Sequence, residues 1–567
     1  MSSQVINALR RLGILAALIG ILGTLAGTPA VADSYTPIAG AGSTWAENAI
    51  DQWRRDVNKN GMRISYAGGG SSDGRRQFLS GTVDFAVSDI PFQTHPTDGS
   101  AAERPAKGSY AYMPIVAGGT VFMYHLTVNG KRVTNLRLSG DVVTKIFTGV
   151  VKTWDDPVIK ADNPGLQLPH RTIVPVVRSD GSGSTAQFTM WMVNQHRDLW
   201  NAYCAKVGRA GSCGQTSYYP TVSGMIAQSG DLGVAGYVAQ NYGEGAIGYV
   251  NYSYARNAHY PVAKVLNHAG YYTEPTPQNV AVSLLKARIN TDKNSADYLT
   301  QQLDGVYNDS DKRNYPLSSY SYMILPLKVQ GTFTEAKGKT LGAFSYYFMC
   351  QGQQQAPNLG YSPLPINLVQ AGFDQIRRIP GVHAQNINIK NCNNPTFTTT
   401  GQNRLAQTAP YPAACDKKGA APCTTGSGGA TTSSGNGSGG SSGGSTGATG
   451  TGTAGGSTGG GTGSAGGNSG QPSVDPDTGQ TISPGGTTGS ASGGTGAGAD
   501  GTVALAQPVA VATAHGWTGT QTLMLLAAVL VFGLLLLPSV ISRLVGSRAD
   551  GNGTHNGNGR SEDGSSR

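Results

Sequence analysis

Residues 178–185 read Arg178-Ser179-Asp180-Gly181-Ser182-Gly183-Ser184-Thr185, and this stretch decides the fold. It follows an apolar run of the β type, residues 172–177, and precedes a segment of helical character, residues 186–193. A strand, a Gly/Ser turn and a helix in this order present several backbone N–H groups to one small anion. Because the turn also carries a guanidinium, a carboxylate and hydroxyl groups, it predicts an oxyanion held by a dense set of hydrogen bonds.

The same order of strand, polar loop and helix recurs towards the N-terminus. Residues 38–57 pass from a β-type run through glycines into an amphipathic run, residues 63–79 repeat the pattern, and residues 81–89 add another strand. Such alternation predicts an α/β fold with a mostly parallel sheet. Ligands of these sheets bind at the carboxyl ends of strands, where the sequence places Thr44, Ser71, Asp89 and Arg178.

Two apolar stretches indicate that the fold has two lobes. Residues 113–124 are expected to form a buried strand pair with a glycine break that carries the chain to a second lobe, and residues 320–327 a strand that crosses back. Two lobes joined by two strands form a hinge with a cleft between them. We therefore expect lobe I over residues 33–115, lobe II over 116–319, and the rest of lobe I with a disulfide-bearing end over 320–423.

Both ends of the chain indicate export and membrane attachment. Residues 1–32 read as a signal peptide, with Arg10 and Arg11 before an apolar run and a small-residue cleavage site before Asp33. Residues 424–518 are rich in Gly, Ser and Thr and predict a disordered linker.

Residues 519–542 are apolar and long enough to cross a bilayer. Arg543 and Arg548 follow this segment, so the positive-inside rule places the tail, residues 543–567, in the cytoplasm. The predicted location is the cell membrane, single-pass, with the lobes outside the cytoplasm.

Six cysteines in an exported chain favour disulfide bonds. Cys204 and Cys213 bracket one short loop and Cys415 and Cys423 another, which would leave Cys350 for Cys392. Six cysteines allow many pairings, so the sequence does not fix this one. A metal site is the alternative, but no Cys/His spacing of the zinc type occurs.

The charge of the chain does not favour a nucleic-acid partner. The formal net charge is +9, yet charged residues make up only 13% of the sequence and no long Lys/Arg run occurs. A diffuse basic surface of this kind is typical of a solvated face.

Two carboxylates in the predicted anion site, Asp89 and Asp180, restrict the ligand. A carboxylate repels an anion unless the anion has a proton to donate, which phosphate has at neutral pH and sulfate lacks. The pattern therefore predicts phosphate. Two other interpretations remain: Asp180 could orient Arg178 through a salt bridge, and Asp89 could cap a strand end.

A serine enzyme is the main alternative from another class. Residues 70–74, Gly70-Ser71-Ser72-Asp73-Gly74, match the Gly-x-Ser-x-Gly pattern of a hydrolase nucleophile. A phosphatase or esterase using Ser71 or Ser72 would need a base, and no histidine lies in a turn of the catalytic type. We interpret Ser72 as a loop residue.

Four motifs in order, at residues 40–45, 70–74, 83–89 and 178–184, resemble the phosphate-binding protein of bacterial high-affinity phosphate ABC transporters. The resemblance extends over about residues 35–395 and includes a family-like strand at 245–250. It implies a type II periplasmic-binding-protein fold that closes over one dehydrated phosphate, without catalysis or cofactor, and permease subunits as partners.

The resemblance also implies a set of phosphate ligands. Asp73 stands where the family usually has glycine and adds a negative charge near the site, and Ser184 replaces a threonine but keeps the hydroxyl. Trp45 and Ala46 replace the usual Phe and Pro. By motif position the ligands are Thr44 with the backbone N–H of Trp45, Ser71, the proton-accepting Asp89, and Arg178, Asp180, Ser182, Gly183 and Ser184.

We thus expect an exported, membrane-tethered phosphate-binding protein that serves phosphate uptake. A surface phosphate sensor or an adhesion protein that kept the binding fold is the second alternative.

Overall fold

The computed structural model describes residues 35–209, 213–398, 400–432, 473–474 and 481–482. The chain divides into two units, residues 1–444 and 445–567. In the second unit, β16 (Ser473–Val474) pairs with β17 (Thr481–Ile482) in antiparallel fashion. The predicted signal peptide, membrane segment and tail lie outside the described residues, as does most of the predicted linker. Within the described ranges, no helix has the length and apolar character needed to cross a membrane.

Lobe I is built on a parallel three-strand core in the order β2-β1-β3. The helix α2 packs on it through Ala49, Ile50, Trp53 and Val57, which recur at the helical spacing of three and four. The elements of this lobe are β1 (Ile38–Gly42), α2 (Glu47–Asn58), β2 (Ile64–Ala67), α3 (Ser71–Leu79), β3 (Phe85–Ser88), α12 (Glu335–Cys350), η3 (Gln351–Gln354), α13 (Ile366–Ile376) and η4 (Ile389–Cys392).

Lobe II continues the same sheet as β10-β8-β9, with these three strands parallel to one another. Its strands are β7 (Arg137–Leu138), β8 (Val174–Arg178), β9 (Ile226–Gln228), β10 (Ala246–Asn251), β11 (Val262–Leu266) and β12 (Tyr272–Thr273), with a hairpin of β5 (Thr127–Val128) and β6 (Lys131–Arg132). Its helices are α4 (Gly140–Phe147), α5 (Pro157–Asp162), α6 (Gly183–Gln195), α7 (Arg197–Lys206), α8 (Gly230–Ala239), η1 (Asn241–Gly243) and α9 (Tyr252–Asn257).

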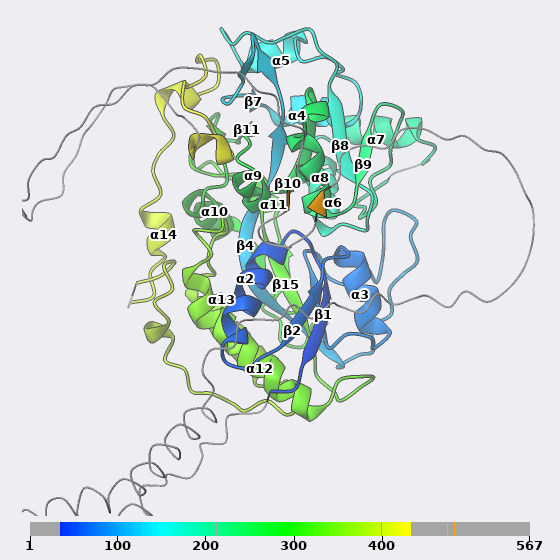
Figure 1. Ribbon diagram of the computed structural model, residues 1–567, viewed down its shortest axis with the longest axis vertical. Helices are drawn as coiled ribbons and strands as arrows, with labels where there is room; N and C mark the ends of the chain where they lie inside the picture. The colour runs from blue at the N-terminus through cyan, green and yellow to red at the C-terminus, as the bar shows by residue number, and fades with distance from the viewer. Residues whose placement is uncertain (1–34, 210–212, 399, 433–472, 475–480, 483–567) are drawn as a thin grey trace, which may run out of the picture. The chain divides into compact units, whose positions relative to one another are not determined.

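The hinge consists of two long, fully buried strands, β4 (Tyr110–Tyr124) and β15 (Ser318–Pro326). β4 pairs with β15 over residues 110–119 and with β10 over residues 120–124, so it belongs to both lobes (Figure 1). The elements that lead into β15 are α10 (Pro277–Ser283), η2 (Leu284–Lys286), β13 (Arg288–Ile289), β14 (Gln301–Gln302) and α11 (Asp304–Tyr307). The predicted α/β fold of two lobes with a two-strand hinge is confirmed.

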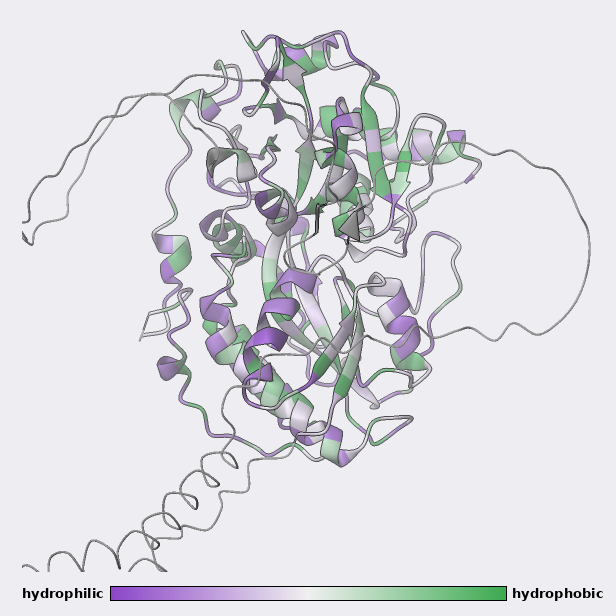
Figure 2. Ribbon diagram, viewed as in Figure 1, coloured by the Kyte–Doolittle hydropathy of each residue, from purple (hydrophilic) through white to green (hydrophobic). Residues whose placement is uncertain are grey.

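The predicted glycine break in the first hinge strand was wrong, because β4 runs unbroken through Gly118 and Gly119. A Cβ atom on Gly118 would lie 2.8 Å from the ring of Trp45, and one on Gly119 would lie 2.3 Å from Cβ of Pro275. These glycines therefore allow close packing on both faces of the hinge. Figure 2 shows many hydrophilic residues on α2 and α3, whereas the hinge strands have mostly pale colours of intermediate hydropathy.

The last described part of the first unit crosses back over the hinge, and we call residues 395–398 and 400–432 the C-terminal strap. Thr396 Oγ1 donates to the carbonyl of Pro363 in lobe I at 2.7 Å. α14 (Arg404–Gln407) then packs on α10 beside the hinge. The strap, the yellow segment in Figure 1, also contains η5 (Ala414–Asp416) and η6 (Gly428–Thr432).

The strap ends on lobe II, which corrects the expectation that the disulfide-bearing end belongs with lobe I. The buried side chain of Arg137 donates to the carbonyls of Cys415 at 2.7 Å and Ala420 at 2.6 Å. Lys264 forms an ion pair with Asp416 at 2.8 Å. A buried guanidinium is stable where several acceptors satisfy it, and the carbonyls of the strap do so.

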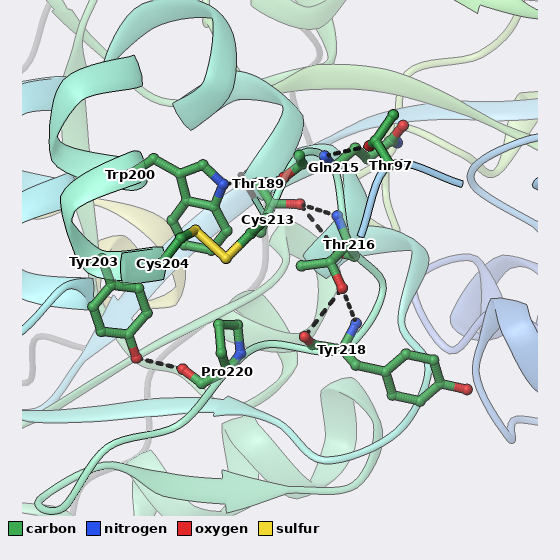
Figure 3. The surroundings of a disulfide bond; sticks show 11 residues. Thr97, Thr189, Trp200, Tyr203, Cys204, Cys213, Gln215, Thr216, Tyr218 and Pro220 are labelled. Carbon is green, nitrogen blue, oxygen red and sulfur yellow. Dashed lines mark hydrogen bonds between the residues drawn. A yellow bond between two sulfur atoms is a disulfide. The ribbon is translucent and has the colours of Figure 1, made fainter. Parts of the chain in front are cut away.

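The structure contains the disulfides Cys204–Cys213, Cys350–Cys392 and Cys415–Cys423, which is the pairing favoured by their spacing. The first of these ties the end of α7 to the loop that follows residue 213 (Figure 3). In this loop the backbone N–H of Gln215 donates to Thr97 Oγ1 of lobe I at 3.2 Å. The disulfide therefore positions a loop that contacts both lobes.

Candidate functional site

Strand ends and helix starts from both lobes meet at one buried place. Lobe I contributes Ser43 and Thr44 after β1, Ser71 at the start of α3, and Asp89 after β3. Lobe II contributes the turn between β8 and α6. The two sides touch: Arg178 Nη2 donates to Thr44 Oγ1 at 2.8 Å, and a Cβ atom on Gly183 would lie 2.4 Å from both Asp89 Oδ2 and Ser71 Oγ. Only glycine at position 183 permits this approach.

Asp89 is buried among hydroxyl groups. It accepts hydrogen bonds from Ser321 Oγ at 2.7 Å, Ser43 Oγ at 2.8 Å and Ser71 Oγ at 3.2 Å. Burial raises the pKa of Asp89 to about 6, although the hydroxyls of Ser321 and Ser43 oppose this shift. Among the described residues, no cation forms an ion pair with it. An ionised carboxylate in this setting can accept one more hydrogen bond, donated by a ligand that carries a proton.

Arg178 has each of its five N–H donors engaged by protein acceptors. Nε and Nη2 bind Asp180 in bidentate fashion, and the second hydrogen of Nη2 goes to Thr44 Oγ1. Nη1 donates to Asp231 and to Ser184 Oγ, the latter at 3.3 Å. Burial alone would lower the pKa of Arg178, but the carboxylates of Asp231 and Asp180 outweigh burial and raise it. Asp180 thus makes the salt bridge to Arg178 that the alternative interpretation of Asp180 required.

The turn after Arg178 leads directly into α6. Ser182 Oγ caps this helix by accepting from the backbone N–H of Thr185 at 3.1 Å, and the N–H of Ser182 donates to Ser217 O at 2.9 Å. Ser217 lies in the loop positioned by the Cys204–Cys213 disulfide. The first-turn N–H groups of a helix, here beginning at Gly183 and Ser184, lack intrahelical acceptors and favour an anion.

Trp45 differs from the other predicted site residues, because its side chain packs against the hinge. Its ring is 1% exposed, and Nε1 donates to Thr120 Oγ1 of β4 at 3.1 Å. The prediction assigned to the site only the backbone N–H of Trp45, and this prediction does not involve the side chain. The structure brings the other eight predicted residues together, namely Thr44, Ser71, Asp89, Arg178, Asp180, Ser182, Gly183 and Ser184.

Sequence reasoning missed three buried residues of the site: Ser43, Ser321 and Asp231. Ser321 lies on the hinge strand β15, where no loop signals it. Asp231 is the second residue of α8, which follows β9 and begins at Gly230, whose φ is +68°. That strand–glycine–helix order is the signal used elsewhere in the chain, but β9 has only three residues and is too short to stand out.

Ser72, a candidate nucleophile of the enzyme alternative, and Asp73, which adds a negative charge, both lie on α3 beside the site. The carboxylate of Asp73 forms an ion pair with Arg76, so its negative charge is balanced locally. Ser72 Oγ accepts from Arg75 Nη2 at 3.3 Å, and its N–H donates to Gly181 O at 2.9 Å. A hydroxyl that accepts from a guanidinium has no general base in that contact, which argues against a nucleophile.

The site combines one guanidinium with three carboxylates, those of the buried Asp89 and Asp231 and that of the partly buried Asp180. When all are ionised, negative charge exceeds positive charge by two. A fully deprotonated anion is therefore repelled, whereas an anion that brings a proton can donate to a carboxylate. The hydroxyl of Ser184, which accepts from Arg178 and Ser182, and the N-terminus of α6 can supply donors for its other oxygens.

Comparison with known proteins places the chain among binding proteins. A family model described as the PBP superfamily domain matches residues 27–351. The chain is 28% identical over 353 residues to the phosphate-binding protein PstS of Methanocaldococcus jannaschii, covering 60% of this chain and 85% of that one. It is 30% identical to the phosphate-binding protein PstS of Pasteurella multocida, covering 62% of this chain and 92% of that one.

A solved structure is also similar to this chain. It is the ancestral soluble variant of the human phosphate binding protein, with 18% identity and a TM-score of 0.45, covering 61% of this chain and 99% of that chain.

Proposed function

The chain belongs to the PBP superfamily and, within it, to the family of phosphate-binding proteins named PstS, and from this premise we propose that it binds inorganic phosphate between its lobes for ABC-type import. One observation carries the proposal: Arg178 and the start of α6 in lobe II face the hydroxyls and Asp89 of lobe I. The nine residues inferred from the motifs are proposed as the ligand set, with Trp45 contributing its backbone N–H.

The selectivity of the site follows from Asp89. At neutral pH its carboxylate is an acceptor without a hydrogen to give, and Ser321, Ser43 and Ser71 already donate to it. A protonated phosphate oxygen can donate to it as well, whereas sulfate would place a bare oxygen against it. The unpaired contact weakens sulfate relative to phosphate.

Isothermal titration calorimetry of the purified full-length chain tests this function. We expect phosphate to bind tightly and sulfate about 5- to 150-fold more weakly, because one buried unpaired acceptor costs about 1–3 kcal/mol. Absence of heat with phosphate would exclude the proposed ligand, and equal affinity for both anions would exclude the role of Asp89.

The site supports binding rather than catalysis. Ser71 Oγ donates to Asp89 Oδ2 at 3.2 Å and Ser72 Oγ accepts from Arg75, so both hydroxyls are engaged in the arrangement of the site. We propose that the chain turns over neither phosphate nor acetate esters.

We also propose that the binding lobes lie outside the cytoplasm and are tethered by the apolar segment 519–542. The apolar length of the segment and the arginines after it support this orientation. Fractionation of cells is expected to recover the chain with membranes, and external protease is expected to remove the lobes. A full-length chain found only in the soluble fraction would overturn the tether and leave the binding function intact.

A further inference from the structure

Asp231 occupies the part of Arg178 that a bound oxyanion would need. Asp180 takes one edge of the guanidinium through Nε and Nη2. The remaining edge, Nη1 with Nη2, faces Asp231 and Thr44 Oγ1. Since an oxyanion binds arginine most strongly along an edge, it competes with this pair of protein acceptors.

The hydroxyl of Thr44 is occupied in the same way. It donates to Asp231 Oδ2 at 2.6 Å and accepts from Arg178 Nη2 at 2.8 Å and from the backbone N–H of Asp231 at 3.1 Å. A hydroxyl has one hydrogen and two lone pairs, so its hydrogen-bonding capacity is used up. It can donate to an anion only after its bond to Asp231 Oδ2 has broken.

Both contested bonds end on a single oxygen of Asp231. Arg178 Nη1 and Thr44 Oγ1 meet Oδ2, whereas Oδ1 accepts from the backbone N–H of Asn251 at 2.6 Å. The Asn251 contact holds the side chain within lobe II, and the Thr44 contact reaches across to lobe I. Asp231 therefore links the lobes through the groups expected to hold the ligand.

We propose that Asp231 is an internal competitor for the ligand: its Oδ2 and a bound oxyanion exclude one another at Arg178 and Thr44. The inference rests on the proposed phosphate-binding function and adds a residue that sets the affinity. Phosphate must displace Oδ2 from both partners and accommodate a third carboxylate nearby. The competition lowers affinity for every oxyanion, while discrimination between oxyanions remains with Asp89.

The substitution Asp231→Asn tests the competition in the full-length chain. The amide oxygen can keep the bond from the N–H of Asn251, while the NH₂ group at the Oδ2 position can no longer accept from Arg178 or Thr44. Removal of a buried like charge should then strengthen phosphate binding about 10-fold or more. Sulfate should gain by a similar factor, so the phosphate-to-sulfate ratio should stay nearly constant.

A matched control is Asp73→Asn, which removes a carboxylate on α3 that Arg76 balances. It should change phosphate affinity less than about twofold, because a balanced, partly exposed charge contributes little. Asp231→Ser provides a second variant should the asparagine protein fail to fold, and it should also bind phosphate more tightly.

The outcomes separate this inference from the function on which it rests. Weaker phosphate binding by a folded Asp231 variant, with the wild type binding, would overturn the competition and make Asp231 a residue that positions Arg178. Tighter binding by the variant than by the wild type would support the competition. Absence of phosphate binding by wild type and variants alike would overturn both the function and the inference.

Discussion

Replacement of Arg178 by methionine is expected to abolish phosphate binding and to lower the free energy of unfolding by about 3–5 kcal/mol. Arg178 is 2% exposed and is the cation between the buried carboxylate of Asp231 and the partly buried carboxylate of Asp180. Methionine fills a similar apolar volume but leaves both acids without a counter-charge. Calorimetry with phosphate and urea unfolding at neutral pH measure the two effects.

Arg76→Met is the control for this experiment. Arg76 lies on α3, pairs with Asp73 and has a side chain that is 74% exposed. Exposed ion pairs contribute at most about 1 kcal/mol, so this variant should unfold and bind phosphate nearly as the wild type does. Retention of phosphate binding by Arg178→Met would show that the guanidinium is not a ligand.

Asp89→Asn is expected to reduce the preference for phosphate over sulfate by at least about 10-fold. The amide NH₂ group can donate to a bare oxygen, so sulfate no longer meets an unpaired acceptor in the site. Competition titrations with the two anions at neutral pH measure the ratio of their affinities. An unchanged ratio would contradict the role of Asp89 as acceptor of the proton of phosphate.

The pH dependence of stability provides an independent measure of the pKa of Asp89 in the folded protein. Its pKa rises from 3.8 to about 6 on folding, so the folded protein holds the proton more strongly than the unfolded chain. The contribution of Asp89 to stability is therefore largest below pH 4, falls between pH 4 and 6, and has decreased by about 3 kcal/mol at pH 7. Glu47, whose pKa burial raises to about 7, contributes a similar decrease in this range. Asp89→Asn should therefore lose about 3 kcal/mol less stability than the wild type between pH 4 and 7, which unfolding curves of the two proteins would show.

The local signals in the sequence were enough to find most of the site. Thr44, Ser71, Asp89 and Arg178 each lie at or near the place where a strand gives way to a polar loop or a helix, and parallel strands bring such places to one edge. Asp231 stands in the same kind of position, but β9 is a strand of three residues and is only partly buried. Its hydrophobic pattern is too weak to mark the loop after it.

Other features depend on contacts that no local pattern contains. Arg137 and Cys415 are separated by 278 positions, and their hydrogen bond fixes the strap on lobe II. Gly118 and Gly119 suggested a break because glycine weakens strands, yet Trp45 and Pro275 require them to be small. In both cases, residues distant in the sequence determine the structure: a hydrogen-bond partner places the strap, and packing partners require the glycines.

The strap determines which lobe is connected to the part of the chain beyond residue 432. Although α12 and α13 of lobe I precede it, the strap leaves the described part of the first unit at residue 432, where η6 packs on α9 of lobe II. With the proposed tether through residues 519–542, a pull from the membrane would act on lobe II, which would be the lobe held at the anchor. Lobe I, which carries Asp89, would then be the lobe that moves, and closure on a ligand would bring the selective side of the site towards a guanidinium held by the anchored lobe.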